Sequence, residues 1–371
     1  MVNYLNVIVG FVSLSFIIQV YYFARYFSAL SFYKFRQTAS PSPIPISVII
    51  AARNEADHLQ AFLDSVLTQE YSTYEVIVVN DCSYDQSSDV LKGFQARYSH
   101  LKVLELEEND KYKHGKKFAL TLGIKAAKYE HLLFTDADCK PHSKYWIREM
   151  QAGFSEGKEI VLSYSPFMKS GGFLNAFSRF ETFYTAFQYL SFALRKNAYM
   201  GVGRNLAYTK SLFFKNKGFA SHMHLLSGDD DLFVNANATK KNVSVVLSPE
   251  SFVYTPSKQS WLGYFKQKLR HLPDAKEYKP HHKFSLALFN ASAFLFILML
   301  PLCFILPVGI EIACSFLIAR LLLSGAFYFT AMRKLATKDL FIYYPILEIV
   351  YFLIMPVWAI ISFFIKSKKW K

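Results

Sequence analysis

An apolar segment long enough to cross a bilayer stands at the start of this chain of 371 residues. Residues 5–24 are almost wholly apolar or aromatic, and no charged side chain precedes Arg25. About 20 such residues span the hydrocarbon core of a membrane. A secretory signal would begin with basic residues and end at a small-residue cleavage site, and neither pattern is evident. The sequence therefore predicts a retained N-terminal anchor within residues 1–30.

Three further apolar segments follow near the C-terminus, namely residues 284–310, residues 312–331 with Arg320, and residues 341–365 with Glu348. They predict a C-terminal membrane region over residues 280–371 with two to three spans. The last segment contains Pro345 and Pro356, so a partly interfacial or re-entrant course is an alternative to a full span. Charges inside a membrane are costly unless they have a partner. We expect Arg320 and Glu348 to pair with each other, or Arg320 to hold a lipid phosphate.

The charge balance favours a membrane partner over nucleic acid. Lysine and arginine number 42 against 28 acidic residues, which gives a formal charge of +14. Such an excess suits anionic lipid or nucleic acid, but the sequence shows no zinc-finger, RNA-binding or basic-zipper pattern. Arg25, Lys34 and Arg36 follow the first anchor. By the positive-inside rule they predict a cytoplasmic middle region, attached to the inner membrane of the cell.

The middle region alternates between predicted strands and predicted helices. Apolar runs indicate buried strands at residues 44–51, 75–80, 101–106 and 131–135. Helix-compatible segments separate them at residues 56–68, 87–98 and 116–128. This alternation predicts an α/β domain over residues 40–275, with a mostly parallel sheet that has helices on both faces. Ligands bind such sheets beyond the carboxyl ends of the strands.

Two later segments are predicted to be helices near the membrane. Residues 173–196 have a helical period and are rich in Phe and Tyr. A buried core helix and an interfacial helix with aromatic rings among the lipid headgroups explain this composition equally well. Residues 261–271 form an amphipathic pattern just before the C-terminal membrane region.

Asp136 and Asp138 come directly after the predicted strand at residues 131–135. Two carboxylates spaced in this way can bind one divalent cation, and Mn²⁺ and Mg²⁺ prefer such hard oxygen ligands. An ordinary acidic turn is the alternative. Because the pair lies at the ligand-binding edge of the predicted sheet, the sequence predicts a metal site that engages a phosphorylated ligand.

Residues 228–231 join a glycine to three consecutive aspartates. Adjacent carboxylates repel one another, so the run is expected to be solvated, metal-bound or held by hydrogen-bond donors. A carboxylate with a raised pKa in this run would suit a general base. Other polar residues at predicted strand ends and helix starts suit a nucleotide, although each also suits an ordinary cap or an exposed surface: Arg53, Glu55, Asp81 and Lys116.

Together these motifs resemble the family 2 glycosyltransferases, which are membrane-bound inverting enzymes with a GT-A fold. The matching elements are residues 48–55, 80–85, 136–138, 203–207, 228–231 and 267–271. The resemblance implies nucleotide-sugar contacts from Ala51, Arg53, Glu55, Asp81, Lys116, Asp136 and Asn205. It implies an acceptor and diphosphate site at Gln267, Arg270 and His271, where His271 replaces the tryptophan of a Gln-x-x-Arg-Trp motif.

The resemblance also implies a single-displacement transfer from a nucleotide-diphosphate sugar, with UDP preferred over GDP. Asp138, assisted by Asp136, would hold Mn²⁺ or Mg²⁺, and Asp230, beside Asp229, would act as the base. The expected acceptor is a lipid or a lipid-linked molecule at the cytoplasmic membrane face. A processive polysaccharide synthase is the alternative within the class. A non-catalytic nucleotide-sensing membrane protein is the alternative outside it.

Overall fold

The computed structural model describes residues 2–35, 42–108, 115–155, 157–225, 227–305 and 309–364. A seven-stranded sheet has the order β3-β2-β1-β4-β7-β6-β8. Its strands are β1 (Ile46–Ala52), β2 (Tyr74–Asp81), β3 (Leu101–Leu106), β4 (His131–Phe134), β6 (Ile160–Leu162), β7 (Leu206–Thr209) and β8 (Val243–Val245). β7 runs antiparallel to both of its neighbours, and the other paired strands are parallel. The predicted mostly parallel sheet is confirmed.

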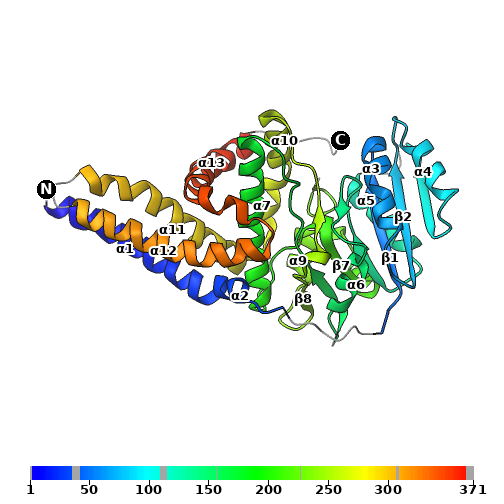
Figure 1. Ribbon diagram of the computed structural model, residues 1–371, viewed down its shortest axis with the longest axis horizontal. Helices are drawn as coiled ribbons and strands as arrows, with labels where there is room; N and C mark the ends of the chain where they lie inside the picture. Colours follow the sequence, from blue (N-terminus) through cyan, green and yellow to red (C-terminus); the bar gives the residue numbers. More distant parts are fainter. Residues whose placement is uncertain are drawn as a thin grey trace.

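Ten of the α-helices in the described residues cover this sheet or extend away from it (Figure 1). They are α1 (Val2–Tyr22), α3 (Ala56–Leu67), α4 (Ser87–Gln95), α5 (Lys116–Ala126), α6 (Trp146–Gln151), α7 (Phe173–Leu194), α10 (Trp261–His271), α11 (Pro280–Ile305), α12 (Gly309–Lys334) and α13 (Tyr344–Phe364). Shorter elements are α2 (Ser28–Ser31), α8 (Lys210–Lys215), α9 (Asp231–Asn237) and the small sheet of β5 (Lys140–Pro141) with β9 (Val253–Tyr254).

The side chains of β1 alternate between two hydrophobic cores. Ile46, Val48 and Ile50 pack into the core that also holds the buried faces of α3, α4 and α6. Ile49 and Ala51 face the opposite core, which is shared with α5 and α7. Because both faces of the strand are buried, its sequence is a continuous apolar run rather than an alternating one.

Helix α7 is a core helix that joins the sheet to the membrane-length helices. Phe180, Phe183, Tyr184 and Phe187 are fully buried, and the ring of Tyr184 lies 4.8 Å from the ring of Tyr351 in α13. Figure 1 shows α7 between the sheet and the extended helical bundle. Of the two interpretations of this aromatic segment, the buried core helix is confirmed.

Within the described part of the chain, four helices are long and apolar enough to cross a membrane: Asn6–Ser31, Pro280–Phe304, Ile310–Lys334 and Lys338–Trp358. They are compatible with an integral membrane protein. α1, α11 and α12 lie side by side and extend away from the sheet, whereas α13 lies beside α7 (Figure 1). The structure thus has three apolar C-terminal helices, and only α11 and α12 share the direction of α1 along the bundle.

A buried polar cluster links three of these helices. Arg320 Nη1 donates to Glu348 Oε2 at 2.8 Å, and Arg320 Nε donates to Gln19 Oε1 at 2.9 Å. Tyr328 Oη donates to the second Glu348 oxygen at 2.8 Å. Arg320 and Glu348 are 6% and 2% exposed, so they satisfy each other within the protein. The expected mutual pairing is confirmed.

Removing one charge of this pair should destabilise the protein more than removing both. Arg320→Leu leaves the buried Glu348 carboxylate without its cation, at a cost of about 3 to 5 kcal/mol. The double variant Arg320→Leu/Glu348→Leu should recover much of that loss, because no lone charge stays buried. Thermal unfolding in detergent measures the order of the three proteins. A double variant less stable than Arg320→Leu alone would contradict this account.

Candidate functional site

A cavity of about 1110 Å³ lies beyond the ends of the parallel strands and reaches α7, α10 and α13. Most of the predicted site residues line it, namely Ala51, Arg53, Glu55, Lys116, Asp136, Asp138, Asp229, Asp230, Gln267 and Arg270. These residues come from segments up to about 200 positions apart in the chain, and the sheet topology brings them to one edge. The predicted metal pair and the predicted base therefore share one cavity.

Lys116 holds two separate acidic motifs together. It is the first residue of α5, and its Nζ atom lies 3.0 Å from Asp136 Oδ1 and 2.9 Å from Asp229 Oδ2. Its side chain is 18% exposed, and that of Asp229 is 8% exposed. The alternative of a solvent-exposed lysine is therefore wrong for Lys116, whose charge compensates carboxylates on two sides of the cavity.

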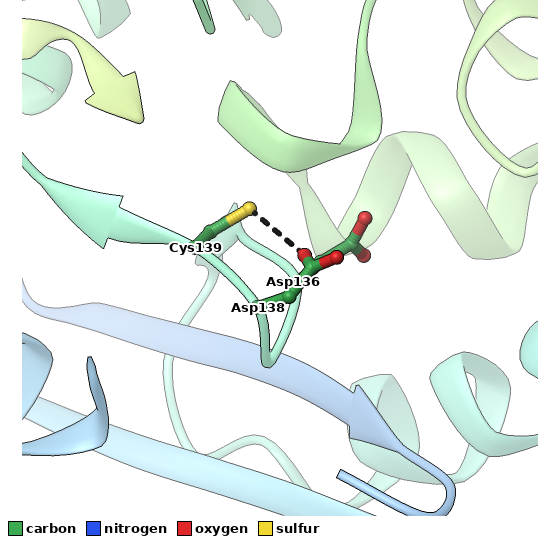
Figure 2. A group of neighbouring side chains, drawn as sticks. All are labelled: Asp136, Asp138 and Cys139. Atoms are coloured by element: carbon green, nitrogen blue, oxygen red, sulfur yellow. Dashed lines mark hydrogen bonds between the residues drawn. The ribbon is translucent and has the colours of Figure 1, made fainter. Parts of the chain in front are cut away.

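The acidic pair after β4 has the donor chemistry of a divalent-cation site. Potential ligand atoms of Asp136, Asp138 and Cys139 all lie within 4.8 Å of one another (Figure 2). Burial, together with the negative charges of Asp138 and Asp136, raises the pKa of the Cys139 thiol well above its usual range. A neutral thiol is a poor ligand for a hard cation. The two carboxylates are therefore the atoms that fit Mn²⁺ or Mg²⁺.

Residues 228–231 form a buried turn rather than a solvated loop. Gly228 has a φ of +90°, and a Cβ atom there would lie 2.6 Å from a Leu232 side-chain carbon. Asp230 Oδ2 accepts from the Gly203 N–H at 2.6 Å, and Asp230 Oδ1 accepts from the Asp231 N–H at 2.8 Å. Because Gly203 and Gly228 have no side chain, the backbone at each can lie close to the side chains of this turn. The turn holds the Asp230 carboxylate in a fixed orientation at the cavity wall.

The adjacent aspartates have opposite pKa shifts. Burial raises the pKa of Asp229, but the charge and hydrogen bond of Lys116 outweigh burial and bring it below its ordinary value. For Asp230, burial and then the charge of Asp229 raise the pKa above its ordinary value. Burial lowers the pKa of Lys116, but the charges of Asp136 and Asp229 outweigh it and raise the pKa. The pair thus contains a firmly ionised carboxylate and a more basic one.

Three predicted site residues are placed differently. Asn205 is fully buried, and its amide group bonds Trp146 Nε1 and the carbonyls of Tyr164 and Ser251. Its side chain braces the domain instead of lining the cavity. Asp81 is also fully buried, behind Arg53, whose Nη1 atom lies 3.6 Å from it. His271 ends α10, and its side chain lies outside the part of the chain that the structure describes.

Sequence reasoning did not predict the contacts of two residues, Lys117 and Tyr278, that hold the segments around the acidic turn. Lys117 is 4% exposed, and its Nζ atom donates to the carbonyls of His222 and Leu225 at 2.6 and 3.0 Å. Tyr278 Oη donates to Asp231 Oδ2 at 2.8 Å. Tyr278 carries no motif signal. Lys117 stands beside Lys116 at a predicted helix start, a place that suits an anionic ligand or an exposed lysine pair, but the carbonyls that it binds lie more than 100 positions away in the sequence.

The sheet order, the acidic pair after β4 and the cavity beyond the strand ends define an α/β domain of the GT-A class. Residues 47–215 match the family model described as glycosyl transferase family 2. The mannosyltransferase PcManGT from Pyrobaculum calidifontis, solved with GDP-Man and Mn²⁺, has a similar fold. The TM-score is 0.58 at 17% identity, over 91% of this chain and 96% of that chain.

Curated relatives match parts of this chain. Glycosyltransferase AglE of Haloferax volcanii is 30% identical over 191 residues, which cover 50% of this chain and 58% of that protein. Poly-beta-1,6-N-acetyl-D-glucosamine synthase of Staphylococcus epidermidis is 39% identical over 93 residues, 25% of this chain and 21% of that protein. Dolichyl-phosphate beta-glucosyltransferase of Drosophila melanogaster is 39% identical over 109 residues, 27% and 32% of the two chains. The matches thus span less than two thirds of each relative.

Replacing Lys117 by Met should loosen the turn that carries Asp229 and Asp230. The substitution removes two charged hydrogen bonds from the segment just before Gly228, each worth about 1.5 to 3 kcal/mol. Amide hydrogen exchange at residues 227–232 should then accelerate by roughly ten- to a hundredfold.

Lys125→Met is the matched control, because Lys125 is exposed on the same helix. In Lys125→Met, the rate of amide hydrogen exchange at residues 227–232 should equal that in the unmodified protein. Equal protection of this turn in Lys117→Met and Lys125→Met would show that Lys117 does not hold it.

Proposed function

We propose that this protein is an inverting, metal-dependent glycosyltransferase that moves a sugar from a nucleotide-diphosphate sugar to a lipid or lipid-linked acceptor. The observation that carries the proposal is the shared cavity. The acidic pair Asp136 and Asp138, the carboxylate Asp230, and residues of the apolar helix α13 all line it. The proposed catalytic domain covers residues 40–275, between an anchor at residues 1–30 and a membrane region at residues 280–371.

The nucleotide sugar is proposed to bind at the strand ends. Arg53 and Glu55 line the cavity after β1, and Lys116 adds a cation beside the acidic pair. A divalent cation held by Asp138 and Asp136 would neutralise the charge that develops on the departing diphosphate. The fold likeness to a mannosyltransferase solved with GDP-Man and Mn²⁺ supports this assignment. We propose UDP as the nucleotide, with GDP as the alternative.

Asp230 is proposed to take the proton of the acceptor hydroxyl. The acceptor oxygen forms the new bond to the anomeric carbon, while the bond from that carbon to the diphosphate oxygen breaks and its electron pair leaves with the diphosphate. The raised pKa of Asp230 suits a proton acceptor. Its two backbone hydrogen bonds keep it oriented. Attack opposite the leaving group inverts the anomeric centre.

The acceptor side of the cavity is proposed to lie at the cytoplasmic face of the inner membrane. Gln267 and Arg270 of α10 line this side, and the basic residues after the first anchor favour this orientation. The similarity to a protein named dolichyl-phosphate beta-glucosyltransferase supports a lipid acceptor. The similarity to a polysaccharide synthase favours a second candidate, a processive synthase. Product size on a gel separates the single-transfer enzyme from the synthase.

Asp230→Asn should abolish sugar transfer while leaving the fold and nucleotide binding intact. Asparagine keeps the shape of the side chain but cannot accept the proton, and a general base contributes about 10²- to 10⁴-fold to rate. Incorporation of radiolabelled sugar into the organic phase measures transfer, and calorimetry with UDP measures binding. Asp89→Asn, on the exposed surface of α4, is the control. Near-normal transfer by Asp230→Asn would rule out its role as the base.

Chelation should stop transfer, and added Mn²⁺ or Mg²⁺ should restore it. Asp138→Asn replaces a charged ligand with a weaker neutral one, so this variant should need a higher metal concentration for half-maximal rate. Titrating each metal into chelator-treated protein measures the shift. Full activity of the unmodified protein in excess chelator would contradict metal dependence. If the protein neither binds nor hydrolyses a nucleotide sugar with any of the metals tested, the alternative of a non-catalytic membrane protein would be favoured.

A further inference from the structure

The lining of the cavity extends beyond the proposed catalytic residues. Thr182, Thr185, Ala186 and Tyr189 line it at helical spacing, so one face of α7 borders it. Tyr351 and Met355, one turn apart on α13, line it as well. Its volume of about 1110 Å³ exceeds the upper range of about 1,000 Å³ for small-molecule sites. The space beyond Asp230 therefore calls for an occupant.

Contacts between helices define the walls of this extension. Tyr184 of α7 packs on Tyr351 of α13 with ring centroids 4.8 Å apart. Phe265 of α10 packs on Trp358 of α13 with ring centroids 3.7 Å apart. α13 is thus attached to both helices that frame the cavity, and Figure 1 shows it beside α7.

The wall contributed by α10 is anchored by a buried carboxylate. Glu181 of α7 accepts from Tyr264 Oη at 2.7 Å and pairs with Lys268 Nζ at 2.7 Å. The Glu181 side chain is 5% exposed, so both partners serve to compensate it. This pair of contacts holds α10 against α7. The passage is therefore bounded by helices that specific contacts hold in place.

The residues that line the cavity differ in chemistry from element to element. Carboxylates and cations include Asp136, Asp230 and Lys116, whereas α13 contributes the aromatic ring of Tyr351 and the thioether of Met355. α13 belongs to a segment that is long and apolar enough to cross a membrane. A ligand with a polar head and an apolar chain can satisfy both sets of residues.

We propose that the passage between α7, α10 and α13 receives the hydrocarbon chain of the acceptor lipid, with Tyr351 and Met355 forming its membrane-side wall. This inference rests on the proposed glycosyltransferase function and adds where the lipid chain lies. The head of the lipid reaches Asp230, and the chain leaves toward the membrane past α13. Met355 has a specific role here, since a larger side chain at that position fills the space that the chain needs.

Met355→Trp tests the passage, and Leu353→Trp is its matched control. Both place an indole on α13, but Leu353 is 48% exposed and does not line the cavity. Each protein is assayed in vesicles of lipid extract for sugar transfer to lipid, and separately for metal-dependent hydrolysis of the nucleotide sugar by water. A third assay uses an acceptor analogue with the same head and a short, water-soluble chain.

Met355→Trp should lower kcat/KM for the membrane lipid by at least about tenfold, because the chain can no longer align the head with Asp230. Hydrolysis and transfer to the short-chain analogue should equal those of Leu353→Trp. Equal lipid transfer by the two variants would overturn the passage while leaving the proposed function intact. Loss of hydrolysis as well as lipid transfer in Met355→Trp would show that α13 supports the whole site, and would also overturn it. If the unmodified protein neither hydrolyses a nucleotide sugar nor transfers its sugar, the proposed function itself would be wrong.

Discussion

The contact of Lys116 with Asp136 and Asp229 is the interaction on which the candidate site depends. Several acidic residues face one partly buried cavity, and their mutual repulsion would open it without a compensating charge. Lys116 supplies that charge from the first residue of α5 and touches one carboxylate on each side. The difference between Asp229 and Asp230 follows from this geometry, because Lys116 bonds only to the former among the contacts described.

The connection between the sheet and the apolar helices is the second constraint. α7 buries aromatic rings against α13 on one side and against the core of the sheet domain on the other. Arg320, Glu348 and Gln19 lock α12, α13 and α1 to one another through charged hydrogen bonds in an apolar surrounding. The position of α13, and with it the far wall of the cavity, is therefore determined by packing and by a buried ion pair together.

Much of the fold could be predicted from local sequence patterns. The expected strand at residues 101–106 and the helix at residues 261–271 coincide with β3 and α10, and the other strands of the parallel set differ by one or two residues at their ends. Asn205 shows where this approach fails. Its motif resembles a sugar-binding segment, but its amide satisfies two buried carbonyls and an indole N–H. A short motif does not show whether a side chain turns toward a cavity or into the core.

The sequence by itself determined the elements and their chemistry. Apolar period and length set the strands, the sheet helices and the membrane-length helices, and the spacing of the aspartates set a pair of carboxylates at a strand end. Only the tertiary structure decided which carboxylate Lys116 compensates, that Lys117 braces the aspartate turn, and that α13 closes the cavity. The physical reason is the distance along the chain over which each interaction acts. Period and propensity act over a few residues, whereas these contacts join positions about 100 or more apart, whose proximity depends on the packing of the whole chain.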